Sequence, residues 1–210
     1  MNDSHISGSG DLRCIYNQTP NSCCSVTGED LVRSKLDAHP RVGCRLESRI
    51  TSKVLRLWRI FGGATNRRAV QAGIAPYAII NATKAFLEDI IRLGGPDANV
   101  LCYKDPATFR YLELLGRMFP NAKFIHMVRD GRAVMASSFN ETGETGDNLK
   151  VWQLVVSRLI RECAAIGSSR CINVRYETLV MHTEREMRRI SEKLLKNISL
   201  VNRSYVLLNV

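Results

Sequence analysis

The sequence has no long hydrophobic run. No stretch approaches the roughly 20 consecutive apolar residues that a membrane-spanning helix requires, and the polar start MNDSHISGSGDLR lacks the apolar core of a secretion signal. The composition, 45% hydrophobic and 24% charged over 210 residues, is that of a globular chain with one sizeable core. We therefore expect one folded domain, with neither a membrane anchor nor a secretion signal in this sequence.

The residue clusters that hold structural zinc are also missing. Seven cysteines and four histidines are present, but without paired C-x-x-C motifs or histidine partners. We therefore expect no metal site. Cys163 and Cys171 flank a short connection between a predicted helix and a predicted strand. They can close it as a disulfide or remain buried thiols, and the residues alone leave both alternatives open.

No segment interleaves aromatic and basic residues in the way that nucleic-acid-binding modules do, and aromatic residues make up only 7% of the chain. A nucleic-acid binder is therefore a weak hypothesis. The net charge is nevertheless +10, from thirty Lys and Arg against twenty Asp and Glu. This balance favours an anionic partner, such as a phosphate-rich cofactor, an acidic peptide or an anionic membrane surface.

Glycosylation sequons of the type N-x-S/T are more frequent than the roughly one or two that chance would give. They start at Asn17, Asn81, Asn140, Asn197 and Asn202. Their number favours a secretory compartment.

Apolar periodicity predicts alternating helices and strands. Helical spacing runs through residues 29–40, 48–63, 76–95, 107–120, 151–167 and 183–198, and strand-like runs cover 99–106, 121–128 and 171–177. The order strand, helix, strand predicts a right-handed βαβ unit and a parallel sheet, so the fold class is α/β. The expected inward side chains are Ile50, Val54, Leu57, Trp58, Phe61, Ile79, Ile80, Phe86, Leu87, Ile90, Ile91, Leu93, Phe109, Leu112, Leu115, Phe119, Met187, Ile190, Leu194 and Ile198.

Polar side chains follow three of the predicted strands. They are Lys104, Arg129, and Tyr176 with Glu177. Ligands of open parallel sheets bind beyond the carboxyl ends of the strands, so these positions mark the candidate site.

Arg129 carries a fork of donors suited to a phosphate, and a helix that starts near Arg132 would add free backbone N–H groups. Ser137, about a turn and a half into that helix, could add a hydroxyl donor. The alternative is that Arg129 pairs with Asp105 or Glu177 inside the sheet, and spacing does not decide between the two.

Four segments together carry a family resemblance. PNAKFIHMVRDGRAVMASS, LDAHPRVGCRLESR, LCYKDP and RECAAIGSSRCINVRYETLVMH, which lie between about Leu31 and His182, resemble the protein-tyrosine sulfotransferases. These enzymes transfer a sulfuryl group from PAPS (3′-phosphoadenylyl sulfate) to peptidyl tyrosine. The resemblance implies a P-loop-like parallel sheet flanked by helices and PAPS as co-substrate, without a metal.

The resemblance also assigns residues to the cofactor. It implies that Arg129 and Ser137 bind the 3′-phosphate of PAPS and that Tyr176 helps to hold the same end. Gly28 matches the glycine of the loop that holds the 5′-phosphosulfate.

For catalysis, the resemblance implies that Glu47 is the general base and that Lys104 and Arg49 stabilise the charge that develops in the reaction. The chemistry is consistent, because a tyrosine hydroxyl has a pKa near 10 and needs a carboxylate against it to take its proton.

Further properties follow from the same resemblance. It implies disulfides between Cys44 and Cys102 and between Cys163 and Cys171, action in the Golgi lumen, acidic tyrosine-containing protein substrates, a possible homodimer and a membrane anchor that is absent from this chain.

The sequence departs from the family at the phosphosulfate loop. The family pattern is close to VPRSGTTL, where this chain has SVTGEDL at Ser25 to Leu31. Val26 replaces the arginine, and Glu29 and Asp30 replace two threonines. Two carboxylates at a site for a phosphosulfate would repel it, so we expect weak PAPS binding.

Two further departures concern the 3′-phosphate site and the end of the chain. Glu141 stands where the family has a second arginine near the 3′-phosphate, and the family continues beyond Val210. We therefore expect an unmatched, disordered segment at residues 1–25 and a partial sulfotransferase domain at 26–210, incomplete at both ends. The alternative is a catalytically inactive sulfotransferase-like binding module, or a regulatory partner of an active homologue.

Overall fold

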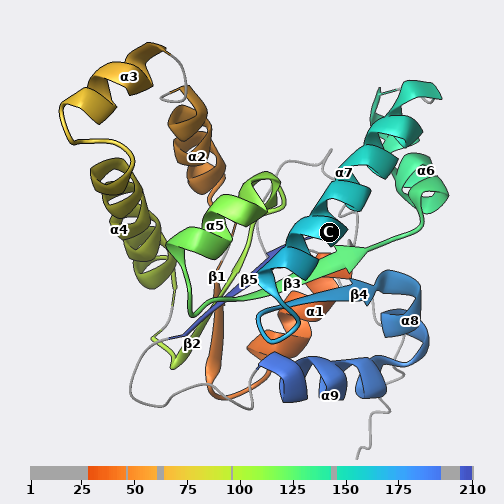
Figure 1. The fold of residues 1–210 in the computed structure, drawn as a ribbon. Helices are drawn as coiled ribbons and strands as arrows, with labels where there is room; N and C mark the ends of the chain where they lie inside the picture. The colour runs from red at the N-terminus through yellow and green to blue at the C-terminus, as the bar shows by residue number, and fades with distance from the viewer. Residues whose placement is uncertain are drawn as a thin grey trace, which may run out of the picture.

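A five-stranded sheet forms the centre of the computed structural model, which describes residues 28–45, 47–60, 64–95, 97–142, 146–194 and 204–209. The strands are β1 (Val42–Arg45), β2 (Val100–Lys104), β3 (Lys123–Val128), β4 (Cys171–Arg175) and β5 (Ser204–Asn209). Their order is β1-β2-β5-β3-β4, and every neighbouring pair is parallel (Figure 1). The predicted α/β class and parallel sheet are confirmed.

The sheet contains two strands that the sequence did not predict. β1 is only four residues long, and β5 lies between β2 and β3. The predicted strand, helix, strand unit is therefore parallel, but its two strands are not neighbours. A run of four residues, as in β1, carries too little periodicity to be told from a loop or a buried turn.

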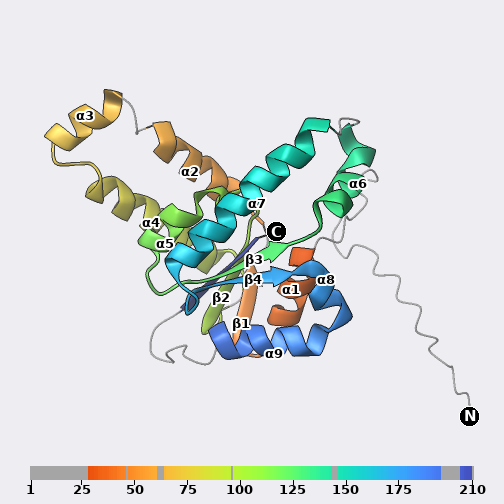
Figure 2. The ribbon, with the colours of Figure 1, turned by 45° about the vertical axis from the view of Figure 1, so that its right-hand side comes forward.

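Helices cover both faces of the sheet. α1 (Gly28–Asp37), α8 (Tyr176–Met181) and α9 (Thr183–Leu194) lie on one face, and α4 (Tyr77–Leu93), α5 (Leu112–Met118) and α7 (Gly146–Ile166) pack on the other (Figure 2). The remaining helices are α2 (Ile50–Ile60), α3 (Ala64–Gln71), the short 3₁₀ helix η1 (Thr108–Tyr111) and α6 (Gly131–Thr142). Over the described ranges, no helix has both the length and the apolarity that crossing a bilayer requires.

Strand alternation separates the two cores. Phe124 of β3 belongs to the core under α5 and α7, whereas the next residue, Ile125, belongs to the core under α1, α8 and α9. Successive side chains of a strand point to opposite faces, so one strand serves both layers. A side chain's position along a strand therefore decides on which face of the sheet it lies.

The predicted inward faces are only partly right. Buried as predicted are Leu87, Ile91, Phe109, Leu112, Leu115, Phe119 and Ile190. The predictions were wrong for Ile50, Leu57, Phe86 and Leu93, which are 47%, 54%, 44% and 75% exposed. α2 and α4 each bury only a narrow stripe of side chains against the core, so the side chains at the margin of each stripe remain exposed to solvent. Phe61, Leu194 and Ile198 lie outside the residues whose side chains are described.

Two disulfides join neighbouring elements, as the family resemblance implied. Cys44 and Cys102 are directly paired in the β1–β2 register, with 4.2 Å between their Cα atoms. Cys163 at the end of α7 is bonded to Cys171 at the start of β4. The alternative of free thiols at this second pair is therefore not borne out. The first disulfide fixes two strands just before they deliver candidate site residues.

Candidate functional site

The candidate residues lie at or just after the carboxyl ends of four strands. Glu47 follows β1, Lys104 ends β2, Arg129 follows β3, and Tyr176 follows β4. Since all strands are parallel, these ends share one edge of the sheet (Figure 1). The structure therefore brings the residues to the same edge.

Glu47 and Lys104 are in direct contact. Lys104 Nζ lies 3.3 Å from Glu47 Oε2, and the side chains of Lys104 and Glu47 are 14% and 26% exposed. Arg49 Nε lies 3.3 Å from the other oxygen, Glu47 Oε1, but the Arg49 side chain is 83% exposed. The carboxylate thus has a half-buried cation on one side and a solvent-facing cation on the other.

The loop that carries Glu47 is held in an unusual backbone conformation. Arg49 has a φ angle of 55°, in the left-handed region that residues other than glycine rarely adopt. This turn ends the loop, and α2 begins at the next residue.

A second carboxylate reaches the same lysine. Asp30, in the first turn of α1, places Oδ1 3.6 Å from Lys104 Nζ. Asp30 is one of the two acidic residues that the sequence placed at the phosphosulfate loop, and α1 begins at Gly28. The Glu29 side chain and residues Ser25 to Thr27 lie outside what the structure describes.

Arg129 stacks on Tyr176. Its Cζ atom lies 4.9 Å from the centre of the Tyr176 ring, a cation–π geometry that orients the guanidinium. Arg129 Nε is buried and has no hydrogen-bond partner in the described part of the chain. A buried N–H without an acceptor costs free energy unless a ligand supplies one. The orphaned donor therefore suits an anion.

The two acidic residues proposed as alternative partners of Arg129 are engaged elsewhere. Glu177 Oε1 accepts a hydrogen bond from the backbone N–H of Asp130 at 2.7 Å. The Asp105 carboxylate accepts hydrogen bonds from Thr51 and from backbone N–H groups. Across the described ranges neither forms an ion pair with Arg129, so the structure does not support that alternative.

The turn after Arg129 is fixed by its own charges. Arg132 donates to the Asp130 carboxylate, with Nη2 2.6 Å from Oδ2. This hydrogen bond, joined by the backbone N–H of Arg132, lowers the pKa of Asp130 to about 2. The Arg132 side chain is 85% exposed. Arg132 is therefore a partner of Asp130 rather than a free cation.

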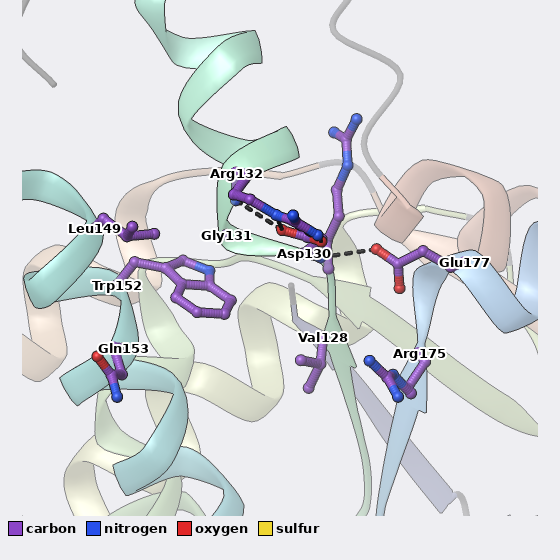
Figure 3. A pocket seen from close by; sticks show the side chains of 10 residues that line it. Val128, Asp130, Gly131, Arg132, Leu149, Trp152, Gln153, Arg175 and Glu177 are labelled. Carbon is purple, nitrogen blue, oxygen red and sulfur yellow. Dashed lines mark hydrogen bonds and ion pairs between the residues drawn. The ribbon is translucent and has the colours of Figure 1, made fainter.

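A groove of about 410 Å³ opens beside this turn, between α7 and the ends of β3 and β4 (Figure 3). A Cβ atom at Gly131 would lie 2.7 Å from the Trp152 ring, so only glycine permits this close approach of α6 and α7. Sequence reasoning did not select Trp152, which lacks a strand-end or motif signal, or Arg175, which is the last residue of β4. The groove is lined by Val128, Arg129, Asp130, Gly131, Arg132, Leu149, Trp152, Gln153, Arg175 and Glu177.

Ser137 falls within α6, whose first residue is Gly131. Its side chain lies outside what the structure describes, so its role stays a prediction, and the Glu141 side chain lies outside the described part as well.

Comparison with known proteins gives a family match. The family model described as "Sulfotransferase family" matches residues 24–195. The chain is 37% identical to protein-tyrosine sulfotransferase A of Caenorhabditis elegans, over 79% of this chain and 46% of that protein. It is 37% identical to protein-tyrosine sulfotransferase 2 of Gallus gallus and 36% identical to protein-tyrosine sulfotransferase 1 of Homo sapiens. Those two alignments cover 78% and 77% of this chain and 47% and 46% of those proteins. The chain spans about half the length of the curated relatives it matches.

Proposed function

Because the chain belongs to the sulfotransferase family, we propose that it transfers a sulfuryl group from PAPS to tyrosine hydroxyls in acidic protein segments. The observation that carries the proposal is the contact between Glu47 and Lys104, 3.3 Å apart at the sheet edge where ligands of such folds bind. Relatives named protein-tyrosine sulfotransferases support the same reaction class.

On the acceptor side, Glu47 is the general base. A carboxylate against the acceptor hydroxyl takes its proton while the phenolic oxygen attacks sulfur. PAPS supplies the sulfuryl group, and the bond between that sulfur and the bridging oxygen breaks. Lys104 and Arg49 stabilise the negative charge that moves onto the leaving phosphate. Both cations already lie 3.3 Å from Glu47 oxygens, so the base and its electrostatic partners form one cluster.

On the donor side, Arg129 holds the 3′-phosphate. Its buried, unpartnered Nε provides a donor, and its stack on Tyr176 fixes the direction of the fork. The positive end of the α6 helix dipole lies two residues further on, where the Arg132 backbone N–H already donates to Asp130. In this proposal the Ser137 hydroxyl is a further donor, and Gly28 allows the chain to approach the 5′-phosphosulfate closely.

The secretory pathway is the proposed compartment, with the Golgi lumen as the site of action and glycosylation at the sequons. Two disulfides fit an oxidising environment. The net charge of +10 complements acidic segments around an acceptor tyrosine.

A second candidate function rests on Asp30. Its carboxylate lies 3.6 Å from Lys104 Nζ, close to where the phosphosulfate end of PAPS is expected. An acidic group at this point repels the donor and competes for the lysine. This contact supports an inactive sulfotransferase-like binding module as the second candidate.

One assay separates the two functions. The wild-type chain and Asp30→Asn are incubated with PAPS and an acidic tyrosine peptide, and sulfotyrosine is identified by mass spectrometry. We expect both proteins to transfer sulfate, and we expect the KM for PAPS to be about fivefold lower in Asp30→Asn. Two unit charges 4 Å apart in water interact by about 1 kcal/mol, and this free energy corresponds to about a fivefold change in affinity. Asp89→Asn, at an exposed position of α4, is the matched control. Binding of PAP, the desulfated product, without sulfotyrosine from either chain would establish the binding module instead.

A further inference from the structure

A chain of buried hydroxyl groups lies directly beside the Glu47–Lys104 contact. Ser48 follows Glu47, and its Oγ atom lies 3.0 Å from the hydroxyl of Tyr103. Tyr103 in turn immediately precedes Lys104 on β2. The Ser48–Tyr103 hydrogen bond therefore joins the loop of the base to the strand of the lysine, one residue away from each.

The network continues into the first turn of α2. Thr51 Oγ1 lies 2.8 Å from the Tyr103 hydroxyl and donates to Asp105 Oδ2 at 2.5 Å. Thr108 Oγ1 lies 2.8 Å from the same Thr51 oxygen. Thr51, Asp105 and Thr108 are all less than 4% exposed, so the side chains must satisfy one another.

The hydroxyl protons have one consistent direction. Thr51 has a single proton, and it goes to the carboxylate of Asp105. Thr108 then donates to the Thr51 oxygen, Tyr103 donates to the Thr51 oxygen or to Asp105 Oδ2 at 3.3 Å, and Ser48 donates to Tyr103. Every hydroxyl is used once as a donor, and the chain ends on a carboxylate, where hydrogen bonds are strongest.

The far end of the chain is anchored to the backbone. Asp105 Oδ1 accepts hydrogen bonds from the N–H groups of Ala107 and Thr108, at 3.0 and 3.2 Å. Tyr103 is 1% exposed, and burial, as the main cause, raises its pKa. The phenol therefore keeps its proton and can act as a donor. The loop of Glu47 is thus tied through Tyr103 to a rigid point at the start of η1.

We propose that the Tyr103 hydroxyl is a positioning group that sets the contact between Glu47 and Lys104 by holding the Glu47 loop against β2. It does not touch substrate. Without it, the segment from Glu47 to Arg49 loses its cross-strand hydrogen bond while Lys104 stays on its strand. This proposal concerns how the base is placed, and it rests on the proposed sulfotransferase function.

Kinetics of Tyr103→Phe provide the first test, since this variant keeps the buried ring and removes only the hydroxyl. We expect kcat for sulfation of an acidic tyrosine peptide to fall about 10- to 100-fold, the range for small misplacement of a reacting group, with an unchanged KM for PAPS. Ser48→Ala breaks the same hydrogen bond from its less buried end, so it should reproduce this separation of kcat from KM. Tyr111→Phe, at the margin of the same core, should leave both constants unchanged.

The reactivity of Lys104 gives a test that does not depend on turnover. Lys104 is 14% exposed and held by Glu47 and Asp30, so loosening the loop should speed its acylation by acetic anhydride several-fold in both variants. The rate at Lys123 serves as an internal standard within each protein. If wild type shows no turnover, the proposed function fails, but the labelling of Lys104 still tests whether the Tyr103 hydroxyl holds the Glu47 loop. Unchanged Lys104 labelling and unchanged kcat, with only a lower thermal midpoint, would overturn the proposal and leave the network a purely structural role.

Discussion

The Glu47→Gln variant is expected to lose sulfate transfer by about 10²- to 10⁴-fold in kcat, the usual contribution of a general base. Glutamine has the same shape, and its amide oxygen can still accept a hydrogen bond from Lys104, but it cannot take the acceptor proton. The Glu47 carboxylate lies 3.3 Å from Lys104 Nζ, and its side chain is 26% exposed. An acceptor hydroxyl can therefore reach it. Steady-state kinetics with an acidic tyrosine peptide measure the loss.

Two controls make this result specific. PAP affinity, measured by calorimetry, should change less than about threefold, because the lost interaction is made in the transition state. Glu113→Gln, which removes an exposed carboxylate on α5, should leave kcat unaltered. Turnover retained in Glu47→Gln would remove Glu47 as the base and leave it only as a partner of Lys104.

Arg129→Ala is expected to weaken PAP binding by about 10- to 100-fold, because hydrogen bonds from a charged donor contribute about 1.5–3 kcal/mol. The Arg129 Nε atom is buried without a partner in the described residues, and its guanidinium lies 4.9 Å over Tyr176. The donor is therefore aligned before the phosphate arrives, so little ordering opposes binding. Calorimetric titration with PAP checks the change.

Arg188→Ala is the matched control, because it removes an arginine on α9 that is 68% exposed and paired with Glu184. PAP affinity should be nearly unchanged in this variant. Thermal unfolding of both variants without nucleotide separates loss of binding from loss of the Tyr176 stack, which contributes at most about 2 kcal/mol. Equal weakening of PAP binding by both substitutions would show general loss of positive charge, and Arg129 would then not be the phosphate site.

The strand ends were the most predictable part of the site. An apolar run followed by a polar residue identifies the end of a buried strand, so the sequence alone places Lys104, Arg129 and Tyr176 at one edge of the sheet. Glu47 was different, because β1 has only four residues and was not predicted from periodicity. The family resemblance supplied Glu47, and the structure placed it beside Lys104.

Apart from the Cys44–Cys102 disulfide, which the family resemblance implied, contacts between distant segments could not be predicted. The insertion of β5 between β2 and β3 depends on a six-residue strand, and short strands carry no signal of their neighbours. The hydrogen bond of Ser48 to Tyr103 joins residues 55 positions apart. Asp30 was predicted to repel the donor, but its contact with Lys104 emerged only from the packing of α1 on the sheet.

The inward faces of α2 and α4 show the limit of periodicity. The spacing of Leu57 and Phe86 is helical, yet both side chains are about half exposed. A helical stripe can be read from sequence, but its margin is set by what packs against it. Leu55 is fully buried in α2 but was not predicted to face inward. The predicted inward stripe of this helix passed through the preceding residue, Val54.

The central claim is that this chain holds a 3′-phosphorylated adenosine nucleotide at the end of β3. Thermal unfolding of the wild-type protein with PAP, beside adenosine 5′-monophosphate at the same concentration, tests it most directly, because the two ligands differ in the 3′-phosphate assigned to Arg129. We expect PAP to raise the unfolding midpoint in a concentration-dependent way and the monophosphate to have little effect. No shift with PAP at millimolar concentration, or equal shifts with both ligands, would contradict the account.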